Sequence, residues 1–166
     1  MTMRSMVAVL LGLTLGSLMA FGEVKQPKPK SQKEVEALQA MFNAQDPDTR
    51  ISAAEALLAK FADTEFKSIA LQMEADAYQQ KGDAEKVIIY CERVLELEPK
   101  SYVALVTLAN TYASKTREFD LDREEKLGKV EKYAHQAIEA INVAEKPNPQ
   151  LAEEQWVAAK KDLIAQ

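Results

Sequence analysis

The chain has 166 residues, 47% of them hydrophobic and 28% charged, which gives room for one domain or two small ones. Five glycines, three of them in the first two dozen residues, and six prolines are too few for the turns of a β-sandwich or a doubly wound sheet, so the composition predicts an all-α fold. The net charge of −5 disfavours nucleic acid as a partner, and a single His with a single Cys excludes most metal sites and catalytic triads.

The first predicted element is an export signal over residues 1–22. A basic start with Arg4 precedes an apolar run of 16 residues, and the small residues Ala20 and Gly22 fit a cleavage site. Because the run is shorter than the roughly 20 residues that span a bilayer, we expect cleavage rather than a membrane anchor. The segment therefore predicts export to the periplasm or outside the cell, with membrane contact only through an uncleaved signal.

Residues 23–32 are predicted to form a linker. They carry Pro27, Pro29 and three lysines with almost no apolar side chain, a composition typical of an extended, solvated tether. The folded part is therefore expected over residues 33–166.

Seven helices are predicted from Ser31 onward, because apolar residues recur there at three- and four-residue spacings. Asp46 and Pro47 are expected to cap and begin the second helix, and Gly82 with Asp83 is expected to form a tight turn that caps a helix over 84–97. Besides the helix over 84–97, the six predicted helices follow the apolar stripes Val35–Phe42, Ile51–Phe61 (the second helix), Phe66–Tyr78, Val103–Tyr112, Leu127–Ile141 and Leu151–Ala165.

A repeat of 34 residues relates the third and fifth of these helices. Leu71, Ala75 and Tyr78 recur as Leu105, Ala109 and Tyr112, and this is the period of the tetratricopeptide repeat (TPR). The chain resembles a TPR protein at these positions, although Glu74 stands where that pattern has a hydrophobic residue. The residues expected to pack the repeats are Leu71, Ala75, Tyr78, Cys91, Pro99, Leu105, Leu108, Ala109, Tyr112 and Ala134.

The resemblance implies an α-α superhelix, a right-handed solenoid of antiparallel helix pairs with about seven helices after the signal peptide. The turn over 61–66 is similar to the turns between repeats of TPR proteins from bacterial envelopes. The implied units are a divergent helix pair over 33–64, the best TPR unit over 68–101, a second unit over 102–146 and a terminal or capping helix over 150–166.

The second unit is expected to carry an insertion between its two helices, within residues 115–128. Tyr112 and Val130 are eighteen residues apart, whereas the equivalent residues of the first unit are nine apart. Asp122 and Glu125 are expected to form a capping box for a lengthened sixth helix. Phe119 and Leu121 are expected either to fold back on the repeat or to contact a partner.

The terminal helix carries Trp156 at the place of the large residue of another first helix, and no eighth helix follows it. Its charged residues could form the polar outer face that a capping helix needs. The alternative is that this helix needs a partner, which makes homo-oligomerisation through the Trp156 helix a second expectation.

No catalytic constellation is expected, so the chain is predicted not to be an enzyme and to need no cofactor or metal. His135 has no second ligand at a suitable spacing, Glu74 has no acidic partner one turn away, and Cys91 lies among apolar residues as a small buried side chain. Asp120 and Asp122 alternate as in a calcium loop, but the glycine and the terminal glutamate of that loop are missing.

The resemblance implies a concave groove lined by the first helix of each pair, in which TPR proteins hold an extended segment or a helix of a partner. Two family lysines that clamp a terminal carboxylate are replaced here by Gln80 and Ser114, so a carboxylate clamp is not expected. The expected groove residues are Gln72, Asp76, Gln79, Val103, Val106, Asn110 and Ala113.

These observations lead to the hypothesis of an exported, non-catalytic scaffold that binds a neutral or basic segment of a partner protein in this groove. The alternative is a structural envelope protein that assembles with itself through its terminal helices, either the Trp156 helix or the helix over Val35–Phe42. A carrier of a small ligand or lipid is disfavoured, because aromatic residues are scarce.

Overall fold

The computed structural model describes residues 27–148 and 150–165 of the chain. The predicted export signal and the first residues of the predicted linker lie outside this part. Within it the chain is all-helical, with seven helices and no strand, as the composition predicts. The helices are α1 (Gln32–Asn43), α2 (Pro47–Lys60), α3 (Lys67–Gln80), α4 (Ala84–Leu97), α5 (Tyr102–Ser114), α6 (Arg123–Val143) and α7 (Glu153–Ile164).

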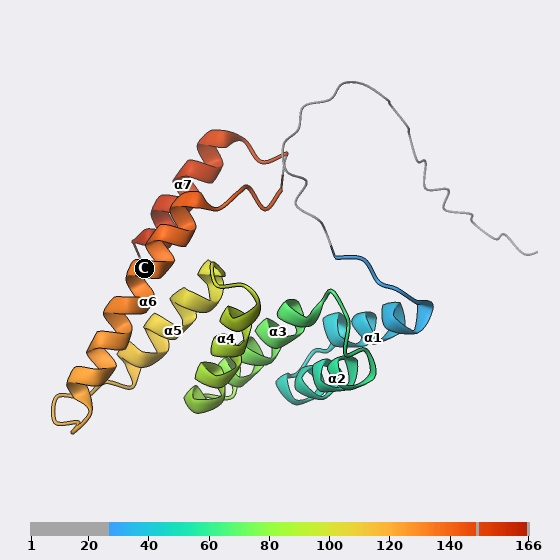
Figure 1. The fold of residues 1–166 in the computed structure, drawn as a ribbon, viewed down its shortest axis with the longest axis horizontal. Coiled ribbons are helices and arrows are strands. Elements are labelled where there is room, and N and C mark those ends of the chain that lie inside the picture. The colour runs from blue at the N-terminus through green and yellow to red at the C-terminus, as the bar shows by residue number, and fades with distance from the viewer. Residues whose placement is uncertain (1–26, 149, 166) are drawn as a thin grey trace, which may run out of the picture.

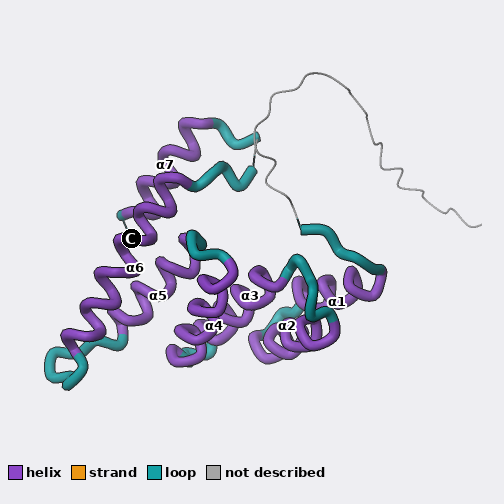
Figure 2. The backbone as a smooth tube through the Cα atoms, viewed as in Figure 1, coloured by secondary structure: helices purple, strands orange, loops and turns teal. Residues whose placement is uncertain are grey.

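The helices follow one another across the molecule in chain order. In Figure 1, α1 and α2 lie at one end and α6 and α7 at the other, and each helix packs mainly on the helices before and after it in the sequence. The connections between them are short, apart from the α5–α6 loop and the segment before α7 (Figure 2). The arrangement therefore consists of successive contacts between neighbours in the sequence.

The starts of the helices are set by local capping signals. Asp46 accepts a hydrogen bond from the backbone of Thr49 at 2.9 Å, with Pro47 as the first helical residue, and Asp83 accepts one from the backbone of Lys86 at 3.1 Å. Both predicted caps are confirmed. Each one satisfies a backbone N–H that has no partner inside its own helix.

The predicted capping box of α6 is wrong. The Asp122 side chain makes no capping hydrogen bond; instead it forms an ion pair with Lys126 Nζ one turn along, at 2.9 Å. Glu125 forms an ion pair with Lys129 at 2.8 Å rather than reaching back to the cap. Because α6 begins at Arg123, residues 123–128 of the predicted insertion belong to the helix, and only 115–122 form the loop.

Two hydrophobic clusters form the core, and α3 contributes to both. Ala70 belongs to a cluster with Leu38 of α1 and Leu57 of α2. Its neighbour Leu71 belongs to a larger cluster that runs through α4, α5 and α6 and includes Leu105. The apolar positions that are 34 residues apart in the sequence, such as Leu71 and Leu105, therefore meet in one continuous core.

Most of the residues predicted to pack the repeats are buried. Pro99 is an exception, since it lies exposed between α4 and α5, and Tyr78, Ala109 and Ala134 are partly buried at the edge of the core. The buried members of the set are Leu71, Ala75, Cys91, Leu105, Leu108 and Tyr112.

The two glycines of the helical region offer a matched test of these local signals. Gly82 has φ +73° in the α3–α4 turn, whereas Gly128 lies inside α6, and a Cβ at either position meets no atom within 4 Å. We expect Gly82→Ala to lower the free energy of unfolding by about 1–2 kcal/mol through backbone strain. We expect Gly128→Ala to raise it by about 0.5–1 kcal/mol through helix propensity.

Urea unfolding followed by circular dichroism measures both values. If both variants changed the free energy of unfolding in the same direction, the backbone explanation would be wrong. A Cβ has equal space at the two positions, and only the backbone conformation differs.

Candidate binding surface

A cavity of about 270 Å³ lies between α5, α6 and α7. Its walls are apolar except for Asn110, and they include exposed residues, so the cavity opens to solvent. For scale, an engineered apolar cavity of about 150 Å³ is large enough to bind benzene. The lining residues are Val106, Ala109, Asn110, Ala113, Val130, Ala134, Ala137, Ile138, Ile141, Leu163 and Ile164.

The cavity exists because α7 covers only part of the surface next to it. Helix α7 has 12 residues and α6 has 21, and α7 lies along one end of α6 in Figure 1. Trp156 holds it there: its side chain is buried and its Nε1 donates a hydrogen bond to the carbonyl oxygen of Ala144 at 3.3 Å. Lys160 Nζ donates to the carbonyl oxygen of Asn142 at 2.9 Å.

The structure brings three of the seven predicted groove residues into this cavity, namely Val106, Asn110 and Ala113. Val103 lies outside the lining, with 43% of its surface exposed.

The three predicted groove residues on α3 also lie outside the lining. Gln72 and Asp76 are occupied with each other, because the Gln72 side-chain amide donates to Asp76 Oδ1 at 2.9 Å, and Gln79 is exposed.

The groove residues predicted from the sequence do not include the side of the cavity that α6 and α7 provide. Val130, Ala134 and Ile138 are visible in the sequence as an apolar stripe, and Leu163 with Ile164 ends the last helix. Core and cavity overlap on this stripe, since Val130 and Ala137 pack in the larger cluster and also line the cavity. The lining can therefore be identified only once the position of α7 is known.

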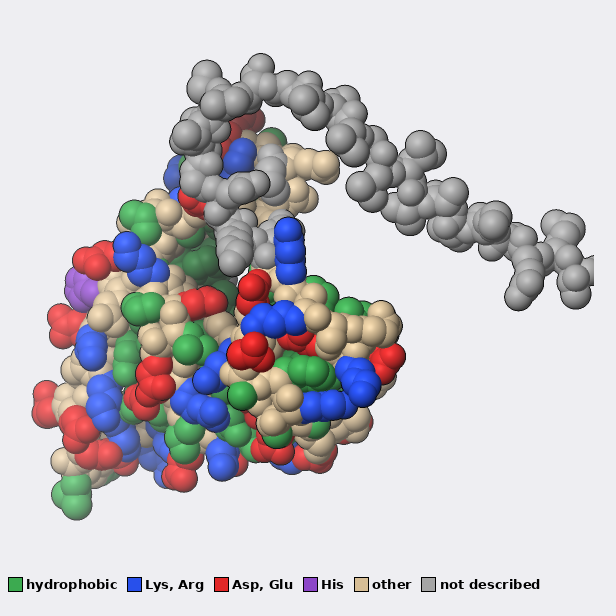
Figure 3. Space-filling model, turned by 45° about the vertical axis from the view of Figure 1, so that its right-hand side comes forward, with side chains coloured by type: hydrophobic (Ala, Val, Ile, Leu, Met, Phe, Trp, Pro, Cys, Tyr) green, Lys and Arg blue, Asp and Glu red, His purple; other side chains and the backbone are tan. Residues whose placement is uncertain are grey.

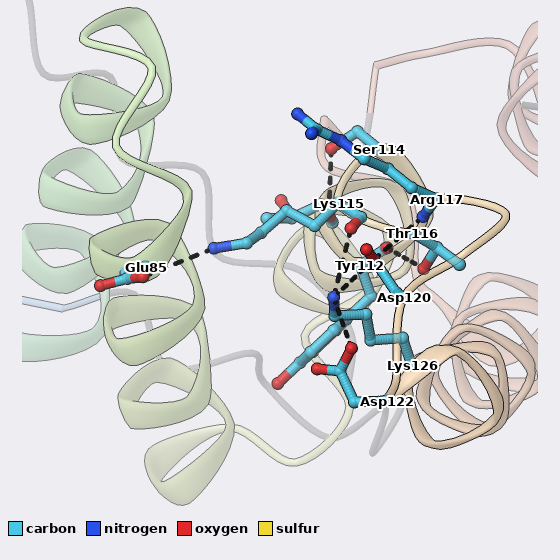
Figure 4. Close-up of polar contacts among 10 residues, drawn as sticks. Glu85, Tyr112, Ser114, Lys115, Thr116, Arg117, Asp120, Asp122 and Lys126 are labelled. Carbon is cyan, nitrogen blue, oxygen red and sulfur yellow. Dashed lines mark hydrogen bonds and ion pairs between the residues drawn. The ribbon is translucent and has the colours of Figure 1, made fainter.

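The α5–α6 loop is held by a cluster of polar contacts around Lys126 (Figure 4). Lys126 Nζ lies 2.8 Å from Asp120 and 2.9 Å from Asp122, and the backbone N–H of Arg117 donates to the Asp120 carboxylate at 3.1 Å. Lys115 extends away from the loop toward Glu85 of α4, with 3.7 Å between the charged atoms. The two carboxylates that resemble part of a calcium loop thus neutralise a lysine.

Phe119 and Leu121 project from this loop into solvent. Phe119 is 89% exposed and Leu121 is fully exposed, so neither folds back on the helices, and the first of the two predicted alternatives is wrong. Hydrophobic side chains form the outermost point of the molecule at the end where the α5–α6 loop lies (Figure 3). On the rest of the face shown there, positive and negative side chains are interspersed.

Glu74 is a buried acid in α3, next to α4. Only 1% of its surface is exposed, and its Oε2 atom receives no hydrogen bond within the described part of the chain. Burial raises the pKa of Glu74 to about 7, and the Glu55 carboxylate adds to the rise. Arg93 and the Tyr90 hydroxyl act in the opposite direction but do not offset the burial.

The remaining candidate groups for chemistry lie apart from one another. Cys91 is completely buried in the larger cluster, and this burial raises the pKa of its thiol to about 12, which keeps it protonated. His135 is exposed on α6. Within residues 27–148 and 150–165, no three His, Cys, Asp or Glu side chains converge where a metal ion could be held.

Comparisons with known proteins add no relative. The chain matches no protein-family model, and a search of curated proteins finds no similar sequence. Among the helices of the described residues, none has both the length and the apolar character that crossing a bilayer requires.

The raised pKa of Glu74 predicts a pH-dependent stability. The unfolded chain ionises Glu74 near pH 4.5 and the folded chain only near pH 7, so the free energy of unfolding should fall between these values and then level off. The shift corresponds to about 3 kcal/mol. We expect Glu74→Gln to remove this fall, and to be more stable than the natural chain at pH 8 but not at pH 4.5.

Urea unfolding at pH 4.5, 6 and 8 measures the effect. Glu96→Gln, which changes an exposed acid of α4, is the control and should keep the natural pH profile. An unchanged profile in Glu74→Gln would show that the folded chain accommodates the ionised carboxylate.

Proposed function

We propose that this chain is an exported, non-catalytic interaction scaffold of the TPR type, which binds a segment of a partner protein between α5, α6 and α7. Export follows from the apolar segment of residues 1–22 and its basic start. The partner is a protein segment with apolar side chains. No cofactor or metal takes part.

The TPR assignment draws its support from the 34-residue repeat and from the burial of the positions that it relates. Leu71 and Leu105 are both 1% exposed and lie in the same cluster. Small buried residues such as Ala75 let the two helices of a pair approach closely, which is the role that the repeat pattern assigns to them. A right-handed solenoid of antiparallel helix pairs is the arrangement that this pattern favours.

The observation that carries the proposal is the cavity itself. It is apolar, it opens to solvent, and it includes the predicted groove residues Val106, Asn110 and Ala113. Apolar pockets with a small number of polar groups are typical binding sites, since burial supplies affinity and the polar group fixes orientation. Asn110 is the one polar lining residue, and its amide can hydrogen-bond to the backbone of a bound segment.

The alternative, stacking through the terminal helices, is less well supported. Trp156 is buried against α6 and is thus unavailable as an anchor for another copy. Phe42 on α1 and Val157 on α7 remain half-exposed, but they lie on helices at opposite ends of the molecule, and the other exposed large hydrophobic residue of α7, Ile164, lines the cavity. Isolated exposed hydrophobic residues are normal on protein surfaces.

Site-specific photocrosslinking tests the proposed site. A photoreactive phenylalanine analogue at Asn110 should crosslink a partner in an envelope extract, and the same analogue at Glu139, exposed on α6, should not. Added Ala113→Glu should lower the yield at position 110 about tenfold, because it places a charge at an apolar wall.

Ala158→Glu, at an exposed position of α7, is the matched control and should leave the yield unchanged. Equal crosslinking from positions 110 and 139, or a yield that Ala113→Glu does not change, would reject the cavity as the binding site. Circular dichroism checks that each variant keeps its helical content.

A further inference from the structure

We propose that the tip of the α5–α6 loop inserts into the cavity between α5, α6 and α7 of a second copy of this chain, so that the molecules associate head to tail. The inference rests on the proposed function and deepens it, since it names the segment that the cavity binds. Two features of the same molecule support it: an exposed apolar tip on the α5–α6 loop and an apolar cavity that opens to solvent.

The loop tip has the composition of an anchor. Phe119 and Leu121 are two large hydrophobic residues, 89% and fully exposed, with only Asp120 between them. Exposed apolar surface of this kind is favourable only when another surface covers it, and aromatic residues that enter a partner's pocket often dominate binding.

The loop is held in shape around this tip. Asp120 is fixed from two sides, by Lys126 Nζ at 2.8 Å and by the backbone N–H of Arg117 at 3.1 Å. Asp122 is fixed by the same lysine, and the backbone N–H of Arg123 donates to the carbonyl oxygen of Asp120 at 3.2 Å. A loop that is already ordered loses little conformational entropy on binding, which favours its use as a rigid insert.

The cavity matches the tip in size and in chemistry. Its volume of about 270 Å³ exceeds the ~150 Å³ that holds a benzene molecule, so it can accept the phenyl ring of Phe119 with room for part of Leu121. Ten of its eleven lining residues are apolar, and none is charged. Asn110 can donate a hydrogen bond to a backbone carbonyl oxygen of the inserted loop.

Charge favours a second copy over a membrane. The loop together with the lysine that holds it, residues 115–126, carries five acidic and four basic side chains, so the tip has no net positive charge that would attract it to an anionic lipid surface. On α7, the turn that leads to the lining residues Leu163 and Ile164 holds Lys160 and Lys161 against one acid, Asp162. The loop, with a net charge of −1, and this turn, with a net charge of +1, are of opposite sign, which adds a small favourable contribution to the contact.

The geometry predicts open chains rather than closed dimers. The tip and the cavity are different surfaces of one molecule, and such a heterologous contact leaves one tip and one cavity free in every pair. The contact area is small, so the association should be weak and should depend on concentration.

Sedimentation equilibrium of the purified chain, from about 10 µM to about 1 mM, tests the inference. The weight-average mass should rise with concentration and pass that of a dimer. A loop variant, Phe119→Ser with Leu121→Ser, and a cavity variant, Asn110→Glu with Ala113→Glu, should each stay monomeric.

Each variant has a matched control that changes the same chemistry elsewhere on the surface. Ile89→Ser with Leu97→Ser removes two exposed hydrophobic residues of α4, and Ala56→Glu with Ala59→Glu adds the same charges at the same spacing on α2. Both controls should associate as the natural chain does.

The decisive sample is an equimolar mixture of the loop variant and the cavity variant. The first retains a working cavity and the second a working loop, so the mixture should form a one-to-one dimer and stop there. A mixture that stays monomeric, a natural chain that stays monomeric at every concentration, or variants that associate as their controls do would each overturn the inference.

The outcomes also separate this inference from the proposed function. A natural chain that is monomeric but crosslinks a different protein from position 110 keeps the binding site and rejects the second copy as its occupant. Crosslinking that is independent of the cavity rejects the proposed function itself.

Discussion

The packing of α3 on two sides is the constraint on which the rest of the structure depends. Ala70 faces the cluster formed with α1 and α2, and the next residue, Leu71, faces the cluster that continues through α4, α5 and α6. Because the helices contact mainly their neighbours in the sequence, each inner helix must present apolar side chains in two directions. A single apolar stripe, sufficient for a helix that covers one layer, would leave the chain divided into two unconnected parts.

Two buried glutamates differ in how their carboxylates are hydrogen-bonded. Glu34 and Glu74 are each 1% exposed. Glu34 accepts hydrogen bonds from the Thr64 hydroxyl and from the backbone N–H of Lys30, both at 2.6 Å, and so joins α1 to the α2–α3 turn. In the part of the chain that the structure describes, Glu74 Oε2 receives no hydrogen bond, and nearby groups offset the desolvation of the carboxylate only in part. Ionised Glu74 therefore lowers the free energy of unfolding.

The sequence predicts most of the fold because helix boundaries depend on local signals. Asp46 and Asp83 cap their helices by accepting hydrogen bonds from backbone N–H groups three residues further along the chain. This spacing can be read from the sequence alone. Asp122 also precedes a helix, but its carboxylate forms an ion pair with Lys126 instead of capping the backbone. The candidate site is less predictable, since its α6 and α7 walls depend on which residues of an apolar stripe a neighbouring helix covers.

The insertion predicted between α5 and α6 supplies the residues of the exposed tip. Part of it, residues 123–128, belongs to α6, which has 21 residues against 13 in α5 and 12 in α7. The residues of α6 that line the cavity, from Val130 to Ile141, all follow the insertion, and the last two residues of α7 complete the lining. The tip and the cavity therefore come from separate parts of the chain, which is why a variant of one can leave the other intact.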